Sequence, residues 1–590
     1  MRSSDGRFVI TFNGEIYNHL ELRERLEREG GVPQGGWRGT SDTETLIASV
    51  AAWGVDDTLK AASGMLAFGL WDARNRSLTL ARDRFGEKPL YVARTHRGIA
   101  FASELKALEG LPGFDTTIDS SALAFFLGHG YVQAPATIYR ATSKLVPGSY
   151  VTLTEANMAA LPSSGDFLAS LRCYYWRLID VAQSGLSAPF LGTESEAVDE
   201  LEKRLMAAVR RQQISDVPLG AFLSGGIDSS AVVALMQASG ETRVKTFTIG
   251  FEDGDYDESV FAEKVAAHLR TDHTTVMMSP NEALERIDRL PAIWDEPFAD
   301  VAQLPALLLS EVTRRSVTVA LSGDGGDELF GGYDRYSWTE SAWTKLKGIP
   351  LPARRALANA VRLIPPSQWD RVARLLPGGV RSRLSGDRIH KIAALIPAAN
   401  VSELYETLLS SWKSRDPLLL GEQPRLVPHW SGYPTLPTIA ETFMLRDAVD
   451  YMTDDVLVKV DRAAMSVSLE TRAPILDPQV AAFAWQLPLA MKRSGGTNKL
   501  VLRKLVHRYV PAELVERPKA GFAVPLDDWL RGPMRAWAET HLSAEALTRG
   551  GLNADPIRRA WQAHLIGTEN HRYFLWNVLT YQAWMAHRLH

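Results

Sequence analysis

The chain has 590 residues, several times the length of a typical domain, so more than one hydrophobic core is expected. Its 65 lysines and arginines nearly balance its 69 aspartates and glutamates, and the net charge of −4 argues against a nucleic-acid partner. The single cysteine, Cys173, excludes an internal disulfide and a multi-cysteine zinc site, and no apolar run is long enough for a membrane helix. We therefore expect a soluble cytoplasmic protein with no nucleic-acid and no membrane partner.

The amino-terminal part alternates short apolar runs with one clear helix. This helix is predicted to begin after Asn18, where Glu21 completes a capping box, and to bury Leu22 and Leu26. The predicted strands cover residues 8–12, 65–71, 77–81 and 89–93. We expect these elements to form a layered α+β domain over residues 1–183.

A linker and a second domain are predicted to follow. Residues 184–196 have the glycine, serine and proline content that is typical of a linker. Residues 197–590 begin with strands at 217–223, 244–251 and 317–321 that alternate with helices. This alternation predicts an α/β domain with a doubly wound parallel sheet, whose ligands bind at the carboxyl ends of the strands. From about residue 337 the pattern is mostly helical, so we expect an α-helical cap.

Two loops rich in serine and glycine follow strands of this predicted sheet. In the first, Gly225 and Gly226 let the backbone approach a ligand closely. Hydroxyl groups stand at the start of the next helix, where anions bind, on Ser224, Ser229 and Ser230. The second loop, over residues 322–328, has a similar composition. Because no Walker motif with its lysine occurs, the loops favour a pyrophosphate group over γ-phosphate transfer.

Acidic residues in both loops complete this interpretation. Asp228 in the first loop and Asp327 in the second are expected to bind Mg²⁺, which takes a few carboxylates together with phosphate oxygens. The paired loops therefore predict an enzyme that splits ATP into AMP and pyrophosphate.

At these residues the chain resembles the class II, glutamine-dependent asparagine synthetases (the asparagine synthetase B type). The resemblance covers nearly the whole chain and includes motifs at 248–251, 295–297, 457–462, 469–477 and 519–522. It implies a truncated glutaminase domain of the Ntn type, followed by an ATP-pyrophosphatase domain with a helical cap. It also implies that ATP adenylates the side chain of aspartate and that ammonia then displaces AMP. The sequence leaves the oligomeric state open, with a homodimer among the alternatives.

The resemblance assigns roles to residues of the second domain. Asp324 matches the site where the intermediate forms, and Lys459 and Lys519 match lysines that bind pyrophosphate and stabilise the transition state. The family's adenosine contacts match Leu223, Ile249, Ser322 and Gly323. Arg462 and Arg472 are left open between a ligand role and structural pairing with a carboxylate such as Glu470 or Asp477.

The resemblance also assigns a glutamine site in the first domain. Asn13 and Gly14 match the oxyanion hole, and Glu15 and Asp42 match the residues that hold the amino acid part of glutamine. The family's nucleophile is an amino-terminal cysteine, which this sequence lacks, and Cys173 does not replace its terminal amine. We expect a misassigned start or a fragment, whereas a genuinely shortened protein would use ammonia.

Other functions stay open at this point. A relative with the same two domains would amidate another carboxylate, or supply nitrogen to a sugar or natural product, because a fold does not determine the acceptor. A tRNA-modifying ATP-pyrophosphatase is disfavoured by the single cysteine and the net charge of −4. An inactive scaffold protein is disfavoured because the acids and lysines of the loops are present.

Overall fold

Antiparallel strands dominate the amino-terminal part of the computed structural model, which describes residues 1–588 except 241, 252–256, 365–367, 370, 372–385, 415, 422–432 and 517–523. The larger sheet has the strand order β1 (Phe8–Ile16), β2 (Gly64–Asp72), β3 (Ser77–Arg82), β7 (Ser149–Thr154) and β8 (Arg172–Tyr174). The smaller sheet has the order β5 (Gly98–Ala102), β4 (Tyr91–Thr95) and β6 (Thr142–Lys144). All neighbouring strands in both sheets are antiparallel.

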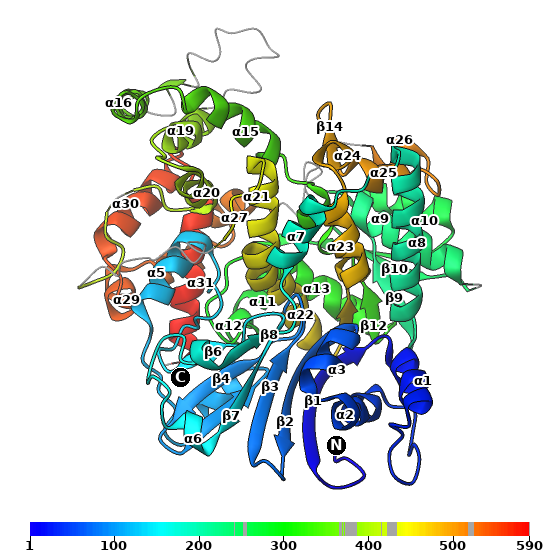
Figure 1. Cartoon of the computed structure of the whole chain (residues 1–590). Coiled ribbons are helices and arrows are strands. Elements are labelled where there is room, and N and C mark those ends of the chain that lie inside the picture. The colour runs from blue at the N-terminus through cyan, green and yellow to red at the C-terminus, as the bar shows by residue number, and fades with distance from the viewer. Residues whose placement is uncertain are drawn as a thin grey trace.

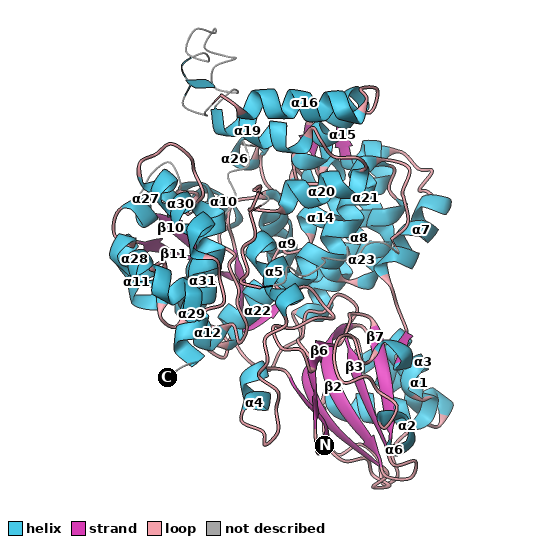
Figure 2. Cartoon of the chain, turned by 90° about the vertical axis from the view of Figure 1, so that its left-hand side faces the viewer, coloured by secondary structure: helices cyan, strands magenta, loops and turns pink. Residues whose placement is uncertain are grey.

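These sheets form a layered arrangement with helices on one side (Figures 1 and 2). The larger sheet packs its apolar side chains against α1 (His19–Glu29), α2 (Asp42–Trp53) and α3 (Val55–Ala61). Leu80 and Val151 of the larger sheet pack with Val92 of the smaller one in a separate buried cluster. The predicted strands and helix of this domain are confirmed, and so is its α+β class.

The predicted capping box at Asn18 is wrong. The Asn18 side chain makes no hydrogen bond to the first turn of α1. It accepts from the backbone N–H of Ser63 at 2.7 Å and donates to the carbonyl of Ala61 at 3.0 Å. The asparagine thus ties the start of α1 to the segment that leads into β2, a partner that local spacing does not reveal.

The second part of the chain contains the predicted parallel sheet. Its strand order is β11 (Asp272–Met278), β10 (Lys245–Phe251), β9 (Leu219–Phe222), β12 (Val319–Leu321) and β13 (Glu470–Arg472). All its neighbouring strands are parallel. The chain leaves β9 towards β10 and later returns to β9's other side with β12, so the order of the strands reverses there. Ligands of doubly wound sheets bind at such a switch point.

Helices cover both faces of this sheet, as the doubly wound class requires. On one face lie α8 (Glu194–Gln212), α9 (Ile227–Ser239) and α10 (Ser259–Leu269). On the other face lie α13 (Gln303–Arg314) and α22 (Leu457–Met465), which bury Leu309 and Ala464 with Phe247 of β10. The last strand, β13, comes from the region that the sequence predicts to be mostly helical, because its three residues contain no apolar run.

The remaining elements are mostly helices, many of them in the cap. Among the described residues they are α4 (Leu105–Glu109), α5 (Ser120–His129), α6 (Glu155–Met158), η1 (Ala169–Leu171), α7 (Leu178–Ser187), α11 (Pro280–Ile287), α12 (Leu290–Ile293), α14 (Gly326–Phe330), α15 (Arg335–Leu346), α16 (Leu351–Arg362), α19 (Gly386–Leu395), α20 (Val401–Leu409), α21 (Ile439–Arg446), η3 (Asp447–Val456), η4 (Pro474–Leu476), α23 (Pro478–Gln486), α24 (Leu489–Lys492), β14 (Arg493–Ser494), β15 (Thr497–Asn498), α25 (Leu500–Val506), α26 (Ala512–Val515), α27 (Leu526–Arg531), α28 (Arg535–His541), α29 (Ala544–Arg549), α30 (Ala554–Leu565) and α31 (Arg572–Arg588). The element η3 is a π-helix that runs directly into α22.

The two parts of the chain share a hydrophobic core. Leu123 and Phe126 of α5 belong to the same buried cluster as Leu575 and Trp576 of α31. Residues 184–196, the predicted linker, contain the end of α7 and the start of α8, and the domain boundary there stays a prediction. Within the described part of the chain, the search for a helix long and apolar enough to cross a membrane found none.

Candidate functional site

A cavity of about 580 Å³ lies at the carboxyl ends of β9 and β12. Its volume falls within the range of roughly 300–1,000 Å³ that small-molecule sites occupy. Its position is the switch point of the parallel sheet, where the two predicted Ser-Gly loops meet. The cavity is therefore the candidate nucleotide site.

The loop after β9 forms one wall of this cavity. Leu223, Ser224 and Gly226 of this loop line it, together with Ile227, Asp228 and Ser229 at the start of α9. The hydroxyl groups of Ser224 and Ser229 lie 3.0 Å apart and hold the turn closed at the start of α9. Since the first residues of α9 line the cavity, the positive end of the helix dipole opens into it.

Three predicted nucleotide contacts do not line the cavity. Gly225, with φ of +70°, faces α10, where a Cβ atom would meet the backbone nitrogen of Ala262 at 2.8 Å. Ser230 is fully buried in α9, and Ile249 is buried within β10. The neighbouring Phe247 and Thr248 line the cavity instead of Ile249.

The loop after β12 forms the facing wall. Ser322, Gly323, Asp324 and Asp327 line the cavity. A Cβ atom on Gly323 would lie 2.6 Å from the backbone nitrogen of Ser229, so glycine lets the two loops touch. Burial raises the pKa of Asp324, and the Ser322 hydroxyl and the charge of Lys459 partly oppose this rise.

A lysine that the sequence analysis did not single out lies between the predicted metal ligands. Lys499 forms ion pairs with Asp228 and with Asp327, the latter at 2.8 Å. Burial alone would lower the pKa of Lys499, but the two carboxylates outweigh it and raise the pKa. The signal in the sequence was the pair Gly495-Gly496, a turn between β14 and β15 that places Lys499 at the start of α25.

The donor set around Lys499 is compatible with Mg²⁺ that is bound jointly with phosphate oxygens. Asp228 and Asp327 come from different loops and converge on one ammonium group, and two carboxylates plus phosphate oxygens suit this ion. Among the described residues, no group of three or more His, Cys, Asp or Glu side chains could hold a metal ion.

Two lysines were predicted to act in catalysis. Lys459 of α22 lines the cavity, and its Nζ atom lies 2.7 Å from Oδ2 of Asp300. Burial alone would lower the pKa of Lys459, but the charges of Asp300 and Asp455 outweigh it and raise the pKa. Lys519 lies outside the described residues.

The predicted glutamine-site residues lie where β1 ends and α2 begins. The Asn13 amide donates to the Ser103 hydroxyl at 2.9 Å, and Oδ2 of Asp42 accepts from the backbone N–H of Ile16 at 2.9 Å. Burial and the nearby charge of Asp42 raise the pKa of Glu15 to about 7. The structure therefore brings Glu15 and Asp42 together, next to Gly14.

Both arginines that were left open make structural pairs. The Arg472 side chain donates to Glu470 at 2.6 Å and to the carbonyls of Gln212 and Ile214, each at 2.8 Å. One of its nitrogens also lies 3.8 Å from Oε2 of Glu15, so Arg472 reaches from the parallel sheet to the predicted glutamine site.

Arg462 lies between the two parts of the chain. It donates to the carbonyl of Ser103 at 2.9 Å and pairs with Asp295 at 3.2 Å. Its role in the fold is therefore to join α22 to the amino-terminal domain.

Comparison with known families accounts for both parts of the chain. The glutamine amidotransferase domain matches residues 1–163, and asparagine synthase matches residues 200–586. The fold and these matches define a ligase in which a glutamine amidotransferase domain precedes a parallel-sheet synthetase domain. The chain belongs to the asparagine synthase family.

Individual relatives are similar over nearly the whole chain. The putative glutamine-hydrolyzing asparagine synthetase of Mycobacterium tuberculosis H37Rv is 33% identical over 98% of this chain and 84% of its own length. The glutamine-hydrolyzing asparagine synthetase 1 of Bacillus subtilis is 29% identical over 98% of this chain and 85% of its own. The amidase chyE of Penicillium rubens is 25% identical over 90% of this chain and 79% of its own length. A solved glutamine phosphoribosylpyrophosphate amidotransferase from B. subtilis covers 48% of this chain and 73% of its own at 14% identity and a TM-score of 0.23, too low to carry an argument.

Proposed function

We propose that this protein makes L-asparagine from L-aspartate in an ATP-dependent reaction that passes through β-aspartyl-AMP. The observation that carries the proposal is one cavity in which Asp324 and Lys459 meet the two Ser-Gly loops at the switch point of the sheet. Glutamine is the proposed nitrogen source of the complete two-domain enzyme, and free ammonia is the source that tests the synthetase domain alone.

Binding of ATP would use the first loop and the start of α9. The adenosine would lie against Leu223 and Phe247, and the triphosphate would accept hydrogen bonds at the amino terminus of α9. Lys499 would balance the charge of the β- and γ-phosphates. Asp228 and Asp327 would hold Mg²⁺, which neutralises charge on the pyrophosphate leaving group when it is bound.

The chemistry would take place beside Asp324 and Lys459. The side-chain carboxylate of aspartate attacks the α-phosphorus, the bond to the β-phosphate breaks, and pyrophosphate leaves. Ammonia then attacks the acyl carbon, AMP leaves, and Asp324 is placed to accept the proton that the nitrogen loses, because its pKa is raised by burial. The Lys459 ammonium stabilises the negative charge that develops at both stages.

The test is product analysis of the purified chain with aspartate, Mg²⁺-ATP and ammonia. Asparagine and pyrophosphate in equal amounts are expected, and omission of aspartate should abolish both. A matched pair of variants is Asp324→Asn and Asp334→Asn, because Asp334 also lines the cavity but is exposed. Pyrophosphate release with another carboxylic acid, and none with aspartate, would show that the acceptor is different.

A further inference from the structure

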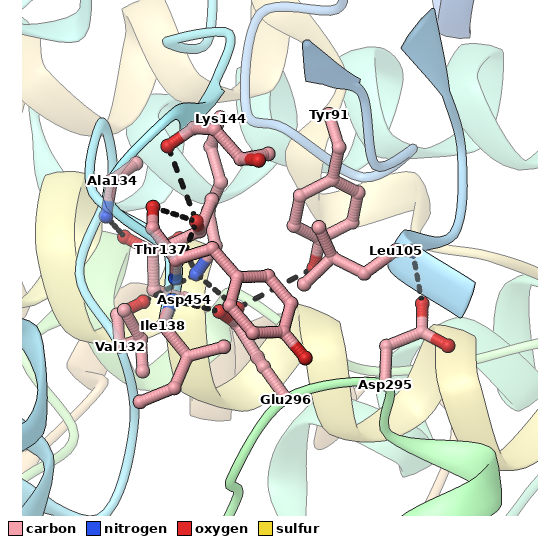
Figure 3. Close-up of polar contacts among 12 residues, drawn as sticks. Tyr91, Leu105, Val132, Ala134, Thr137, Ile138, Lys144, Asp295, Glu296 and Asp454 are labelled. Atoms are coloured by element: carbon pink, nitrogen blue, oxygen red, sulfur yellow. Dashed lines mark hydrogen bonds and ion pairs between the residues drawn. The ribbon is translucent and has the colours of Figure 1, made fainter. Parts of the chain in front are cut away.

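One ammonium group of the amino-terminal domain is buried between two carboxylates of the synthetase domain (Figure 3). Lys144, at the end of β6, is 4% exposed, and its Nζ atom lies 2.7 Å from Oε1 of Glu296 and 3.8 Å from Oδ1 of Asp454. The ammonium group also donates to the carbonyl of Val132. Lys144 thus joins residues 294–302, the irregular segment between α12 and α13, to the π-helix η3.

Both carboxylates are held by other groups of the amino-terminal domain as well. Oε2 of Glu296 accepts from the backbone N–H of Ile138 at 3.1 Å, and Oε1 accepts from the Tyr91 hydroxyl at 3.4 Å. Oδ2 of Asp454 accepts from the backbone N–H of Ala134 at 2.7 Å. The positions of both acids are therefore set from outside the synthetase domain.

The same two segments supply the carboxylates that surround Lys459 in the cavity. Asp300 follows Glu296 in the irregular segment and pairs with Lys459 at 2.7 Å. Asp455 follows Asp454 in η3, is 6% exposed and interacts with Lys459 through its charge. Two short stretches of backbone therefore connect the buried Lys144 with Lys459, whose side chain is 16% exposed in the cavity. Each stretch has one acid that faces Lys144 and a second acid that faces Lys459.

The segment that carries Asp300 is held in part by the amino-terminal domain. It forms no helix or strand, and Asp295 within it has a φ of +40°, which is rare for a residue with a side chain. Two of its hydrogen bonds reach the amino-terminal domain: Asp295 accepts from the N–H of Leu105 at 2.8 Å, and Ala299 donates to the carbonyl of Gly130 at 2.7 Å. Within the synthetase domain, the Trp584 indole donates to the carbonyl of Asp295 at 2.8 Å. The place of Asp300 thus depends in part on contacts between the domains.

We propose that Lys144 is a positioning residue for Lys459. By fixing Glu296 and Asp454, it sets the arrangement of Asp300, Lys459 and Asp455 in the nucleotide cavity, although it touches no substrate itself. This inference rests on the proposed function. The physical reason is that a buried carboxylate without its cation is costly, so the loss of Lys144 shifts both segments towards other partners or water.

The experiment compares Lys144→Met with Lys106→Met in the full chain. Lys106 is a matched control because it also faces this irregular segment, 3.7 Å from Asp295, but its side chain is 49% exposed. Ammonia-dependent pyrophosphate release is measured at varied ATP, after circular dichroism has shown that each variant is folded. For Lys144→Met, kcat is expected to fall about 10- to 100-fold, as misplacement of a catalytic group does. Its KM for ATP should stay within about twofold, because the adenosine contacts are untouched.

Equal kcat values for the two variants, or a raised KM with kcat unchanged, would overturn the inference. If Lys144→Met does not fold, Glu296→Gln takes its place, since the amide keeps an acceptor for Ile138 but loses the charge that pairs with Lys144. A second readout does not depend on turnover: the rate at which a small amine-reactive ester labels Lys459, followed by peptide mass spectrometry. Faster labelling in Lys144→Met than in Lys106→Met supports the inference and equal labelling contradicts it, even if wild-type protein were to release no pyrophosphate with aspartate.

Discussion

Charge balance at single residues shapes the nucleotide cavity, and Lys499 is the clearest case. We predict that Lys499→Met lowers pyrophosphate release about 100-fold, because it removes a preorganised cation and leaves two carboxylates to repel the triphosphate. Steady-state pyrophosphate release checks this. The control is Lys504→Met. Lys504 lies in α25, which Lys499 precedes, and its side chain forms a half-exposed ion pair with Glu194. Equal activity of the two variants would show that Lys499 has only a structural role.

Lys492 is a second buried cation, but it lies outside the cavity and has no hydrogen-bond partner among the described residues. Burial lowers its pKa from 10.5 to about 8. The unfolded chain therefore binds more protons between these values, so the free energy of unfolding should rise as pH increases from about 8 to about 10.5.

Replacement of Lys492 directly tests how much free energy the burial of its charge costs. Lys492→Met should raise the free energy of unfolding at pH 7 by on the order of 3 kcal/mol and remove this pH dependence. Urea denaturation at pH 7 and at pH 10 checks both effects. The exposed Lys203 supplies the control Lys203→Met, which should change little. A loss of stability in Lys492→Met would instead mean that the contact of its ammonium group with the Trp485 ring, at 4.8 Å, outweighs the cost of burial.

At the scale of elements, strand β1 shows how closely the glutaminase sheet is packed. Gly14 pairs with Leu66 of β2 and has a φ of +150°, and a Cβ atom there would lie 2.1 Å from the carbonyl oxygen of Met65. We predict that Gly14→Ala lowers the free energy of unfolding by more than about 2 kcal/mol, from strain and overpacking together. Urea denaturation measures this.

Gly98 provides the control for that substitution. It also has a positive φ, +131°, but a Cβ atom there meets nothing within 4 Å. Gly98→Ala should therefore cost about 1 kcal/mol, from the backbone conformation alone. If both variants lose the same free energy, the contact with Met65 relaxes freely and β1 is less constrained than its geometry indicates.

The same scale shows what the sequence could predict. Apolar runs such as the one in β2 are local signals, so the strands they mark are where they were expected. The strand β13 has only Glu470, Thr471 and Arg472, and it is a strand because β12 lies beside it. The π-helix η3 is built from residues that an ordinary helix would also accept, so no periodicity reveals it.

The candidate site also contains some residues that the local sequence predicts and others that it does not. Loop residues that line the cavity, such as Gly226 and Gly323, stand in dense local motifs and were found from them. Lys499 was missed because its partner Asp228 lies 271 residues away in sequence. The nearby Gly495-Gly496 turn indicates where α25 begins but does not indicate an ion pair. The pairing of Asp300 with Lys459 was missed for the same reason. Local patterns thus predict the glycine-rich loops, whereas the ion pairs of Lys499 and Lys459 depend on tertiary packing.

At the scale of the whole molecule, the two domains share two buried apolar clusters and several buried ion pairs. Lys88 of the first domain pairs with Asp461 of α22 at 2.8 Å, and both side chains are buried. We therefore predict a single cooperative heat-absorption peak in scanning calorimetry, because neither domain can unfold without exposing the other's core. Lys88→Met should lower its midpoint and leave one peak. Two separate peaks in the wild-type protein would contradict the prediction.

The packing of α5 against α31 also has a consequence for synthesis. Asn577 of α31 donates to the carbonyl of Phe126 in α5, 451 residues earlier in the chain. At translation rates of about 5–20 residues per second, α5 leaves the ribosome roughly 20–90 seconds before α31 exists. During that time the side chains of α5 lack their partners on α31, so we expect the nascent chain to depend on a chaperone until α31 has been made.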